Sequence, residues 1–466
     1  MEPTPPELER VPAPVAVDEV FVDDVAALLR DGQQGMVLLL VAELHPADVA
    51  QLLRRLPPDA ADELFGWLPE EQAGAALPEM ESAQRSDLLD EMETHAIVSL
   101  LDEIDTDDAA DVLADLRPDV AERVLPRLED ADEIEALLRY EDDTAGGLME
   151  TDYVAVPQTV TVAEATEELR RCAEEVDPVY VVYVLDAEDR LVGLVDLKTL
   201  VLARSDAPIT SIMDTDLVTV EPDLDQEEVA RIMERYDLVI LPVVSSSGHF
   251  LGRITIDDIV DVIRDEAEED LQRASGIAGD EEFSASVFAI SRGRLVWLLI
   301  GLVGAYGSGL VIRGFEGALE AAAVLAMFIP IVMAMAGNAG IQSSAIAVQG
   351  LASGDLWNSD VPRRLAKELA VALINGVALA LALGLIVVAM GSLGGLGDVD
   401  TPRLALTSAL SLLIVIVIAT VLGATIPLLL DRVGIDPALA TGPFITTSND
   451  IIGLAVFFTV ASLLYL

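Results

Sequence analysis

The stretch LALTSALSLLIVIVIATVLGATIPLLL (404–430) decides the fold class, because it runs for 27 residues without a charged side chain. About 20 apolar residues in a helix cross the ~30 Å hydrocarbon core of a bilayer, so this stretch predicts a membrane-spanning helix. Four further apolar blocks lie in the same half of the chain: 295–312, 319–336 with an extension towards 350, 369–393 and 438–466. The sequence therefore predicts five transmembrane helices.

Basic side chains are unevenly distributed around these five blocks. If the N-terminal half lies in the cytoplasm, the inner flanks carry six basic residues and the outer flanks carry two. The inner six are Arg292, Arg294, Arg363, Arg364, Lys367 and Arg432, and the outer two are Arg313 and Arg403. Cytoplasmic flanks are enriched in basic residues. The pattern predicts a multi-pass protein of the cytoplasmic membrane, in contact with lipid, with its C-terminus outside.

Acidic side chains are concentrated in the other half. The chain of 466 residues contains 81 Asp and Glu against 27 Lys and Arg, a formal net charge of −54, yet residues 284–466 hold only 10 acids and 8 bases. Residues 1–283 carry the remaining −52. This sign excludes nucleic-acid binding. It predicts a salt-rich cytoplasm, as in a halophilic microbe, or acids that are held together by divalent cations.

Other residue types give fewer positive signals. Cys172 is the only cysteine, which excludes a disulfide within the chain. The soluble half has no P-loop, no GxSxG and no metal-ligand cluster of His and Cys, so an enzyme is not predicted. The acidic, proline-rich start predicts a disordered tail over residues 1–20 without a signal peptide.

Asp450 is the most conspicuous polar residue of the predicted spans, in the segment TTSNDIIG (446–453). A carboxylate in hydrocarbon is costly, so an acid at this place is expected to face a water-filled pore and to attract cations there. The alternative is a position at the end of the span, in the membrane interface.

The second block contains PIVMAMAGNAGIQSS (330–344), with Gly337, Gly340, Asn338 and Gln342. Small residues let helices approach closely, and such a pattern is also typical of plain helix packing. Carbonyl, amide and carboxylate oxygens together are typical of a hard cation such as Mg²⁺. Three further prolines predict interrupted helices, which membranes tolerate where backbone lines a cavity: Pro427, Pro437 and Pro443.

Residues 44–140 repeat with a period of twelve. Apolar residues recur at two positions of the unit, which are Leu44, Leu56, Leu68, Met80, Met92, Ile104, Leu116 and Leu128, and Leu53, Phe65, Leu77, Leu89, Leu101, Leu113, Leu125 and Leu137. Helix starts are predicted at Pro46, Pro58 and Pro118, and helix caps at Ser82, Thr94, Thr106 and Asp130. Short helices that bury one face on their neighbours form a solenoid, for which a scaffolding role is expected.

A second repeat follows the first. LMETDYVAV (148–156) matches IMDTDLVTV (212–220), and VYVLDAEDRLVG (182–193) matches LPVVSSSGHFLG (241–252). Each copy predicts a strand, a helix, two further strands and another helix. This α/β pair resembles tandem CBS domains, a module that senses ligands.

Thr255 and Asp258 in the second copy resemble the Thr-x-x-Asp ribose site of CBS modules that bind adenine nucleotides. The first copy has Asp196 and Thr199 in the reverse order. The pattern implies a nucleotide site, with capping of the strand end as the plain alternative.

An acidic helix is predicted over residues 257–272. Spacings of three and four place Asp258, Asp261, Asp265 and Glu269 near one face, where like charges repel. The face predicts a divalent-cation site, or a solvated surface of a salt-adapted protein.

The order of these parts resembles the MgtE family of magnesium channels from about residue 20 to residue 466. PIVMAMAGNAGIQ (330–342) and DPALATGPFITTSNDIIG (436–453) look like the second and fifth membrane helices of that family. The resemblance implies a multidomain protein, in which an all-α solenoid, an α/β CBS pair, an acidic plug helix and a five-helix membrane bundle follow one another. After the tail, the implied boundaries are 21–143 for the solenoid, 144–206 and 207–264 for the two CBS domains, 265–290 for the plug helix and 291–466 for the membrane bundle.

Specific residues are implied by the same resemblance. Asp450 is the pore carboxylate that holds hydrated Mg²⁺, with Asn338, Thr446 and Gly442 beside it. The family often has an asparagine where this chain has Gly442, a departure that bears on ion selectivity. Cytosolic Mg²⁺ bridges acids of the solenoid, the CBS pair and the plug helix. The acids that align with this region are Asp258, Asp261, Glu266 and Glu269, whereas solenoid partners are not assigned.

These features together predict a homodimeric Mg²⁺ channel for uptake, which cytosolic Mg²⁺ shuts, with ATP or another adenine nucleotide in the CBS pair. One alternative is a CBS-gated transporter of another divalent cation, such as Mn²⁺ or Co²⁺. A second alternative is a membrane-tethered sensor of nucleotide or ionic strength without transport. Measurement of divalent flux with competing ions separates the three.

Overall fold

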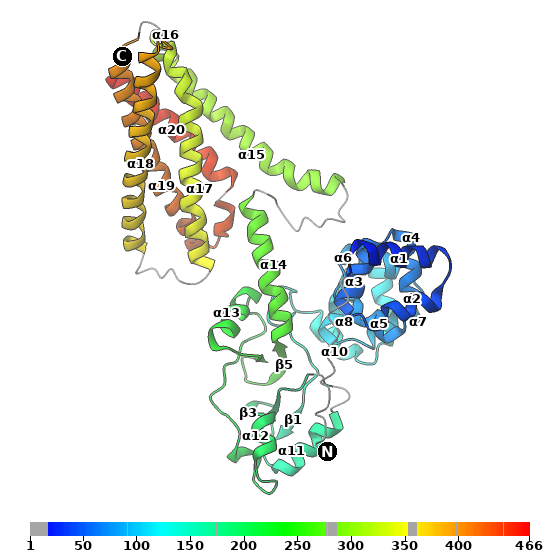
Figure 1. Cartoon of the computed structure of the whole chain (residues 1–466). Coiled ribbons are helices and arrows are strands. Elements are labelled where there is room, and N and C mark those ends of the chain that lie inside the picture. Colours follow the sequence, from blue (N-terminus) through cyan, green and yellow to red (C-terminus); the bar gives the residue numbers. More distant parts are fainter. Residues whose placement is uncertain are drawn as a thin grey trace, which may run out of the picture. The chain divides into compact units, whose positions relative to one another are not determined.

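Two units make up the chain, and they divide between Arg264 and Asp265 in the computed structural model of Figure 1. The structure describes residues 17–90, 92–172, 176, 178–275, 277, 287–352, 361–396, 399–440 and 442–466. The predicted tail and the predicted plug segment lie partly outside this description, at residues 1–16, 276 and 278–286.

The helices that begin the first unit follow the predicted period of twelve. Seven of them start at intervals of twelve residues, from Pro46 to Pro118. Their bounds and those of their neighbours are α1 Glu19–Arg30, α2 Gln34–Val41, α3 Pro46–Arg55, α4 Pro58–Phe65, α5 Glu70–Ala76, α6 Ser82–Asp90, α7 Thr94–Leu101, α8 Thr106–Asp115, α9 Pro118–Val124, the 3-10 turn η1 Leu125–Arg127 and α10 Ala131–Leu137. Helices two apart in sequence pack together, for example α3 with α5 and α6 with α8. This arrangement confirms the solenoid.

The recurring apolar positions form the core of the solenoid. Leu53, Leu77 and Leu89 are fully buried, and Leu44, Leu56 and Leu116 are nearly so. Each short helix therefore gains its stability from packing on its neighbours, because an isolated helix of eight to ten residues is marginal in water.

Three of the predicted helix caps are wrong: Ser82, Thr94 and Thr106. Each is the first residue of its helix, at the place that proline takes in other units. The residues at the cap positions of α7 and α8 are Glu93 and Asp105. Thr106 instead lies with its hydroxyl oxygen 2.9 Å from the hydroxyl oxygen of Thr151. Asp130 does stand at the cap of α10, without a side-chain hydrogen bond to the helix.

The first CBS copy contains a three-stranded sheet in the order β1-β2-β3. Its elements are β1 Ala155–Pro157, α11 Val162–Cys172, β2 Val181–Leu185, β3 Leu191–Asp196, α12 Leu197–Leu202 and the 3-10 turn η2 Ile209–Ser211. β1 runs parallel to β2, and β2 runs antiparallel to β3 with Val182 opposite Val195. Both of these valines are buried, as expected for a strand at the centre of a sheet.

The second copy contains α13 Gln226–Tyr236, β4 Ile240–Val244, β5 Phe250–Thr255 and α14 Ile256–Ala274. Its predicted first strand is reduced to a single parallel bridge between Val220 and Val243. The backbone that follows Val220 pairs with the start of the first CBS copy, since the carbonyls of Pro222 and Leu224 accept hydrogen bonds from the amides of Gly146 and Ala145. β4 and β5 pair antiparallel, and α14 confirms the predicted acidic helix.

Among the residues that the structure describes, five helices of the second unit are long and apolar enough to cross a membrane, which agrees with the predicted number. The elements are α15 Val287–Gly314, α16 Glu316–Ala321, the 3-10 segment η3 Ala323–Phe328, α17 Ile329–Ala352, α18 Val361–Ser392, α19 Thr401–Arg432, the 3-10 segment η4 Pro437–Ala440 and α20 Pro443–Leu464. α17 to α20 lie side by side (Figure 1), around a core that includes Phe328, Phe457 and Phe458.

The prediction that Pro427 interrupts a helix is wrong. Pro427 lies inside the continuous helix α19, where it removes one backbone donor. Membrane helices tolerate this loss because packed neighbours re-satisfy the freed groups. Pro437 and Pro443 do mark a break, since α19 ends at Arg432 and α20 begins only at Pro443.

Glycines let α17 approach two of its neighbours. A Cβ at Gly340 would overlap the amide nitrogen of Asn449 in α20, and a Cβ at Gly423 in α19 would overlap the backbone oxygen of Gly340. Asn449 is 1% exposed, and its amide donates a hydrogen bond to the carbonyl of Ala336 at 3.3 Å. These contacts confirm the predicted close packing at Gly340.

Replacing Gly340 with alanine is expected to destabilise the protein. The added methyl group has to displace Asn449 and Ile445, and overpacking of this kind costs about 1–3 kcal/mol. The matched control is Gly309→Ala in α15, where a Cβ meets nothing within 4 Å. Thermal unfolding of the two purified variants is the measurement, and a lower unfolding temperature for Gly309→Ala than for Gly340→Ala would contradict the packing argument.

Candidate metal centre and membrane site

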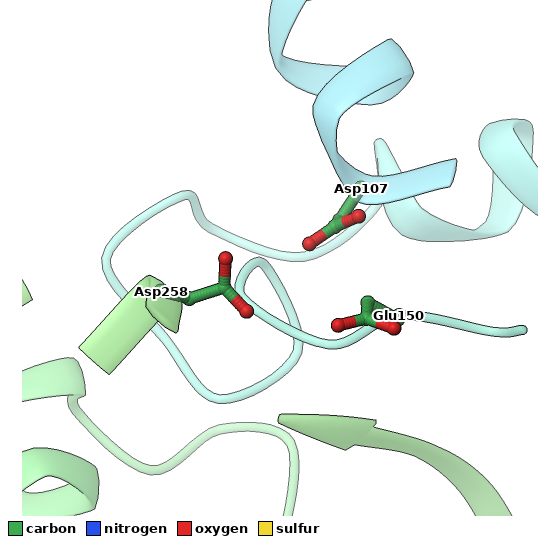
Figure 2. Close-up of side chains that lie close together, drawn as sticks. All are labelled: Asp107, Glu150 and Asp258. Atoms are coloured by element: carbon green, nitrogen blue, oxygen red, sulfur yellow. The ribbon is translucent and has the colours of Figure 1, made fainter. Parts of the chain in front are cut away.

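Three acids from separate parts of the first unit meet at one place (Figure 2). Asp107 lies in the first turn of α8, Glu150 in the segment that precedes β1, and Asp258 in the first turn of α14. One carboxylate oxygen from each lies within 4.8 Å of the other two. Asp107 is 8% exposed and Glu150 is 6% exposed. We name this set the acid cluster.

Backbone pairing places Glu150 beside the second CBS copy. The amide of Glu150 donates to the carbonyl of Arg253 at 2.8 Å, and the amide of Arg253 donates to the carbonyl of Glu150 at 3.0 Å. Arg253 belongs to β5, which leads directly into α14. Glu150 and Asp258 are therefore held together by one strand end, whereas Asp107 comes from the solenoid.

Helix geometry favours acids at two of these positions. Asp107 and Asp258 each lie in the first turn of a helix, where unpaired backbone N–H groups and the helix dipole favour negative charge. The dipole offsets part of the cost of burying each acid. It does not remove the repulsion between the acids themselves.

The guanidinium of Arg253 pairs with the acid cluster. Arg253 Nη2 lies 2.7 Å from Glu150 Oε2, and its side chain is 3% exposed. The hydroxyl of Thr255 lies 3.0 Å from Glu150 Oε1 and 2.7 Å from Asp258 Oδ2. A hydroxyl has one hydrogen and can donate it to one carboxylate only. Thr255 therefore donates to one of the two carboxylates or shares its hydrogen between them, and it cannot satisfy both acids fully.

The electrostatics favour the protonated form of these acids. Burial, followed by the charges of Asp108 and Asp258, raises the pKa of Asp107 well above its ordinary value. Burial raises the pKa of Glu150 to about 7, although Arg253 opposes this shift. Burial also raises the pKa of Asp258 to about 6, and that of Asp108 to about 8 with help from the charge of Asp258.

An acid cluster of this kind has two ways to become neutral. It takes up protons, or it binds a cation that takes their place. Carboxylate oxygens are the ligands that Mg²⁺ and Ca²⁺ prefer, and Mg²⁺ usually binds one or two carboxylates and keeps several waters. The donor set thus fits a hard divalent cation.

The membrane site is built on the first turns of α20. Gly442 is the N-cap of α20, and Thr446 and Asp450 follow it at intervals of four residues, so Thr446 and Asp450 share one face of this helix. The hydroxyl of Thr446 donates to the carbonyl of Gly442 at 3.3 Å. The side chain of Asp450 is half-buried. The arrangement presents one carboxylate, with a hydroxyl one turn before it, near the start of a membrane helix.

Models of known protein families match most of the chain. A model described as a divalent cation transporter matches residues 329–460, the model of the MgtE intracellular N domain matches residues 44–143, and the CBS model matches residues 145–206 and 209–265. The magnesium transporter MgtE of Thermus thermophilus is 38% identical over 334 residues, which are 71% of this chain and 72% of the relative. The chain belongs to the MgtE family of magnesium transporters.

Further relatives agree with this membership. The magnesium transporter MgtE of Enterococcus faecalis is 36% identical over 72% of each chain. A crystal structure of the cytosolic domain of the Mg²⁺ channel MgtE in complex with ATP has a TM-score of 0.50 and 34% identity, and the match covers 52% of this chain and 99% of that one. The predicted family and the predicted order of solenoid, CBS pair, acidic helix and membrane bundle are confirmed.

The four acids predicted on α14 of this MgtE-family chain separate into different environments. Asp258 belongs to the acid cluster. Asp261 is largely exposed and pairs with Arg264 at 2.9 Å on its own helix. Glu269 pairs with Arg273, which also lies 2.7 Å from Asp436. Glu266 lies between them in the same helix. Only Asp258 reaches the cluster in the part of the chain that the structure describes.

Asp107 and Glu150 are the cluster residues that the sequence reasoning missed. Asp107 occupies the second helical position of its unit, as do the exposed acids Asp59 and Asp119. Glu150 is buried, but the residue that aligns with it in the second CBS copy, Asp214, is exposed. The local sequence therefore gives no signal that separates a cluster acid from a solvated one.

The remaining predicted residues lie as follows. Thr255, predicted at a ribose site, is 1% exposed and has both of its hydroxyl contacts within the acid cluster. Asn338 lies on α17, where it lines a cavity together with residues of α18 and α19. Asp450 does not line that cavity.

Proposed function

We propose that this MgtE-family chain forms a homodimeric Mg²⁺ channel of the cytoplasmic membrane, which closes when cytosolic Mg²⁺ binds the acid cluster. The observation that carries the proposal is the meeting of Asp107, Glu150 and Asp258 within 4.8 Å. The family membership supports magnesium as the transported ion. The first unit and the start of α15 are cytosolic in this proposal, and the C-terminus is outside.

Gating follows from the origin of the three acids. Asp107 comes from the solenoid, whereas Glu150 and Asp258 lie in the CBS pair. When Mg²⁺ is scarce, repulsion between the acids favours separation of the solenoid from the CBS pair. A bound Mg²⁺ offsets this repulsion and favours the closed arrangement. The ion shifts the equilibrium only because it binds the closed state more tightly than the open state.

Conduction is assigned to the face of α20 that carries Asp450. In the proposed pore, Asp450 attracts hydrated Mg²⁺, with Thr446, Gly442 and Asn338 as supporting polar groups. The negative-inside potential drives the ion inward, since each elementary charge gains about 2.3 kcal/mol per 100 mV and a divalent ion gains about twice as much. Asp261, Glu266 and Glu269 on α14 are proposed as further Mg²⁺-sensing acids that act beside the cluster.

The test is Mg²⁺ influx into proteoliposomes that contain the full chain. Influx is measured against the Mg²⁺ concentration on the side of the first unit, at high KCl so that the acidic surface is screened. Closure as this Mg²⁺ rises supports the proposal, and influx that is indifferent to it contradicts the gating part. Competition by Mn²⁺ and Co²⁺ distinguishes a Mg²⁺ channel from a transporter of other divalent cations, and an absence of any divalent influx would favour a sensor without transport.

Nucleotide binding is a second candidate function of the CBS pair. A relative's cytosolic domain has been solved in complex with ATP, and Thr255 and Asp258 carry the Thr-x-x-Asp spacing. Because both residues also contact or belong to the acid cluster, ATP is proposed to change the Mg²⁺ concentration at which the channel closes. Titration of influx against Mg²⁺ with and without ATP tests this, and an unchanged midpoint contradicts it.

Protons and Mg²⁺ are expected to compete for the acid cluster. The pKa values of Asp258, Glu150 and Asp108 are raised to about 6, 7 and 8 in the folded protein, against ordinary values near 4 in the unfolded chain. The stability that these acids contribute is fully present below about pH 4, and it is lost as the pH rises from there through about 6 to 8. Without Mg²⁺, the unfolding temperature of the first unit should therefore fall over this range.

Thermal unfolding of the full chain, at several pH values and with or without Mg²⁺, measures this competition. Bound Mg²⁺ at 100 times its dissociation constant adds about 2.7 kcal/mol, and this gain should grow with pH as protons leave. The double variant Asp107→Asn, Asp258→Asn is the control and should respond weakly to both pH and Mg²⁺. A Mg²⁺ effect that is equal at pH 5 and about pH 8 would contradict the competition.

A further inference from the structure

A cavity of about 450 Å³ lies between α17, α18 and α19 in the membrane unit. Of the described residues that line it, none belongs to α20, the helix of Asp450. Six of the lining side chains are polar: Asn338, Gln342, Ser343, Glu368, Asn375 and Thr420. Polar groups among membrane helices are costly and tend to mark a site that binds or conducts something polar.

Glu368 is the acidic residue of this cavity. It is 7% exposed and lies seven residues after the first residue of α18, Val361. Ser343 donates a hydrogen bond to Glu368 Oε2 at 2.7 Å, and Arg364 Nη2 lies 3.2 Å from Glu368 Oε1. A buried carboxylate of this kind persists only with a counter-charge or a proton. Arg364 supplies the charge from one turn earlier in the helix.

The counter-charge, Arg364, is more exposed than the carboxylate of Glu368 with which it pairs. A quarter of the Arg364 side chain is exposed, compared with a tenth of the Glu368 side chain. The guanidinium therefore lies at the margin of the cavity, and the carboxylate lies inside it. A cation that enters the cavity competes with Arg364 for Glu368.

Three amides supply further oxygen atoms. Asn338, Gln342 and Asn375 are exposed residues on the open side of the cavity, and in the described part of the chain their side chains make no hydrogen bond to another residue. Amide groups between membrane helices need water or a ligand as partner. Amide, hydroxyl and carboxylate oxygens together form a donor set for a hard cation. Since one water occupies about 30 Å³, the cavity has room for an ion with its first shell of waters.

We propose that this cavity is a second intramembrane site for a hydrated divalent cation, in which Glu368 is the carboxylate ligand and Arg364 is a tethered counter-ion that the metal displaces. Asn338, Gln342 and Asn375 contact the waters of the ion through their amide oxygens. The proposal goes beyond the proposed channel, which shares Asn338 with this site but has Asp450 as its carboxylate and needs no ion at Glu368. Each chain would then hold a divalent cation beside α18 as well as one at α20.

A local probe is needed to test this, because the acidic surface of the first unit binds divalent cations diffusely. The native Cys172 is replaced by serine, and Ile346, an exposed residue of the cavity lining, is replaced by a cysteine that carries a nitroxide. The full chain also carries Asp450→Asn, which removes the proposed pore carboxylate, and Asp107→Ala, which takes one of the three acids from the acid cluster. Mn²⁺, a paramagnetic substitute for Mg²⁺, is titrated in about 1 M KCl, where the Debye length is about 3 Å.

Saturable broadening of the nitroxide signal by Mn²⁺ is the expected result. Glu368→Gln should weaken the apparent Mn²⁺ affinity by about tenfold or more, and Asn375→Ala should do the same. Asn375→Ala leaves the Glu368–Arg364 pair intact, so it provides a test even if Glu368→Gln does not fold. Arg364→Gln should strengthen it, because the competing charge is removed. Glu320→Gln in α16, which does not line the cavity, is the matched control and should change nothing.

Two outcomes would overturn the proposal. The first is an absence of saturable broadening in the parent chain. The second is an affinity that stays the same in both Glu368→Gln and Asn375→Ala. Because binding is measured in a chain whose proposed pore and gate are already disabled, neither outcome depends on whether the chain conducts Mg²⁺. A failure here therefore differs from a failure of the channel proposal.

Discussion

Replacing Asp107 with alanine is expected to leave the channel open at cytosolic Mg²⁺ concentrations that close the parent protein. Asp107 is the only member of the acid cluster that the solenoid contributes. Its loss leaves Glu150 and Asp258 free to bind an ion, but such an ion no longer ties the solenoid to the CBS pair. A hydrogen bond between a charged carboxylate and a water of the hydrated ion is worth about 1.5–3 kcal/mol. The Mg²⁺ concentration for half closure should therefore rise about 10- to 100-fold.

The repeat itself provides the matched control for this experiment. Asp59 occupies the same second position of α4 that Asp107 occupies in α8, four units later, and it is exposed. Asp59→Ala removes the same charge from the same helical position and should leave the closing concentration unchanged. Equal effects of the two substitutions on Mg²⁺-dependent influx would show that the cluster is no more than part of a generally acidic surface.

Loss of the Asp450 carboxylate is expected to reduce Mg²⁺ influx by about 10- to 100-fold, because one charged contact of about 1.5–3 kcal/mol is removed from the conduction path. The substitution Asp450→Asn keeps the shape of the side chain and removes its charge. It is best made in the Asp107→Ala background, whose gate is held open. A low influx then reflects the pore and not closure of the cytosolic domains.

Two comparisons complete the Asp450 experiment. Asp431→Asn removes an exposed acid at the end of α19 and should conduct like its parent. The single variant Asp450→Asn, without Asp107→Ala, keeps an intact acid cluster. Mg²⁺ should therefore still raise its unfolding temperature, and this shift shows that the variant is folded. Influx at the parental rate through Asp450→Asn would rule out this residue as the pore carboxylate.

Periodicity explains why so much of the fold was predictable. The starts of seven solenoid helices follow from one repeated spacing, because each helix must turn the same face to its neighbours. The membrane helices follow from length and hydropathy alone. Pro427 shows the limit of such rules, since the sequence indicates a missing backbone donor but not the packing that tolerates it inside α19.

The acid cluster was only partly predictable, for a different reason. Asp258 was predicted from its place in the acidic helix and the CBS motif, whereas Asp107 and Glu150 acquire their role through burial against distant segments. The raised pKa of Glu150 comes from that burial, and no local pattern encodes it. Glu368 was missed because three basic residues precede it closely, so that the apolar block seemed to begin just after it.

The regular spacing of the solenoid also bears on how such a chain can change by insertion and deletion. Helix starts recur every twelve residues from Pro46 to Pro118. Gain or loss of one whole unit before α8 would alter the number of coils and would leave Asp107 in the second position of its helix. Gain or loss of a single residue would instead rotate the face of one helix by about 100°. Solenoids of this kind are therefore free to vary in length by complete units over evolution, while the ion-binding end keeps its geometry.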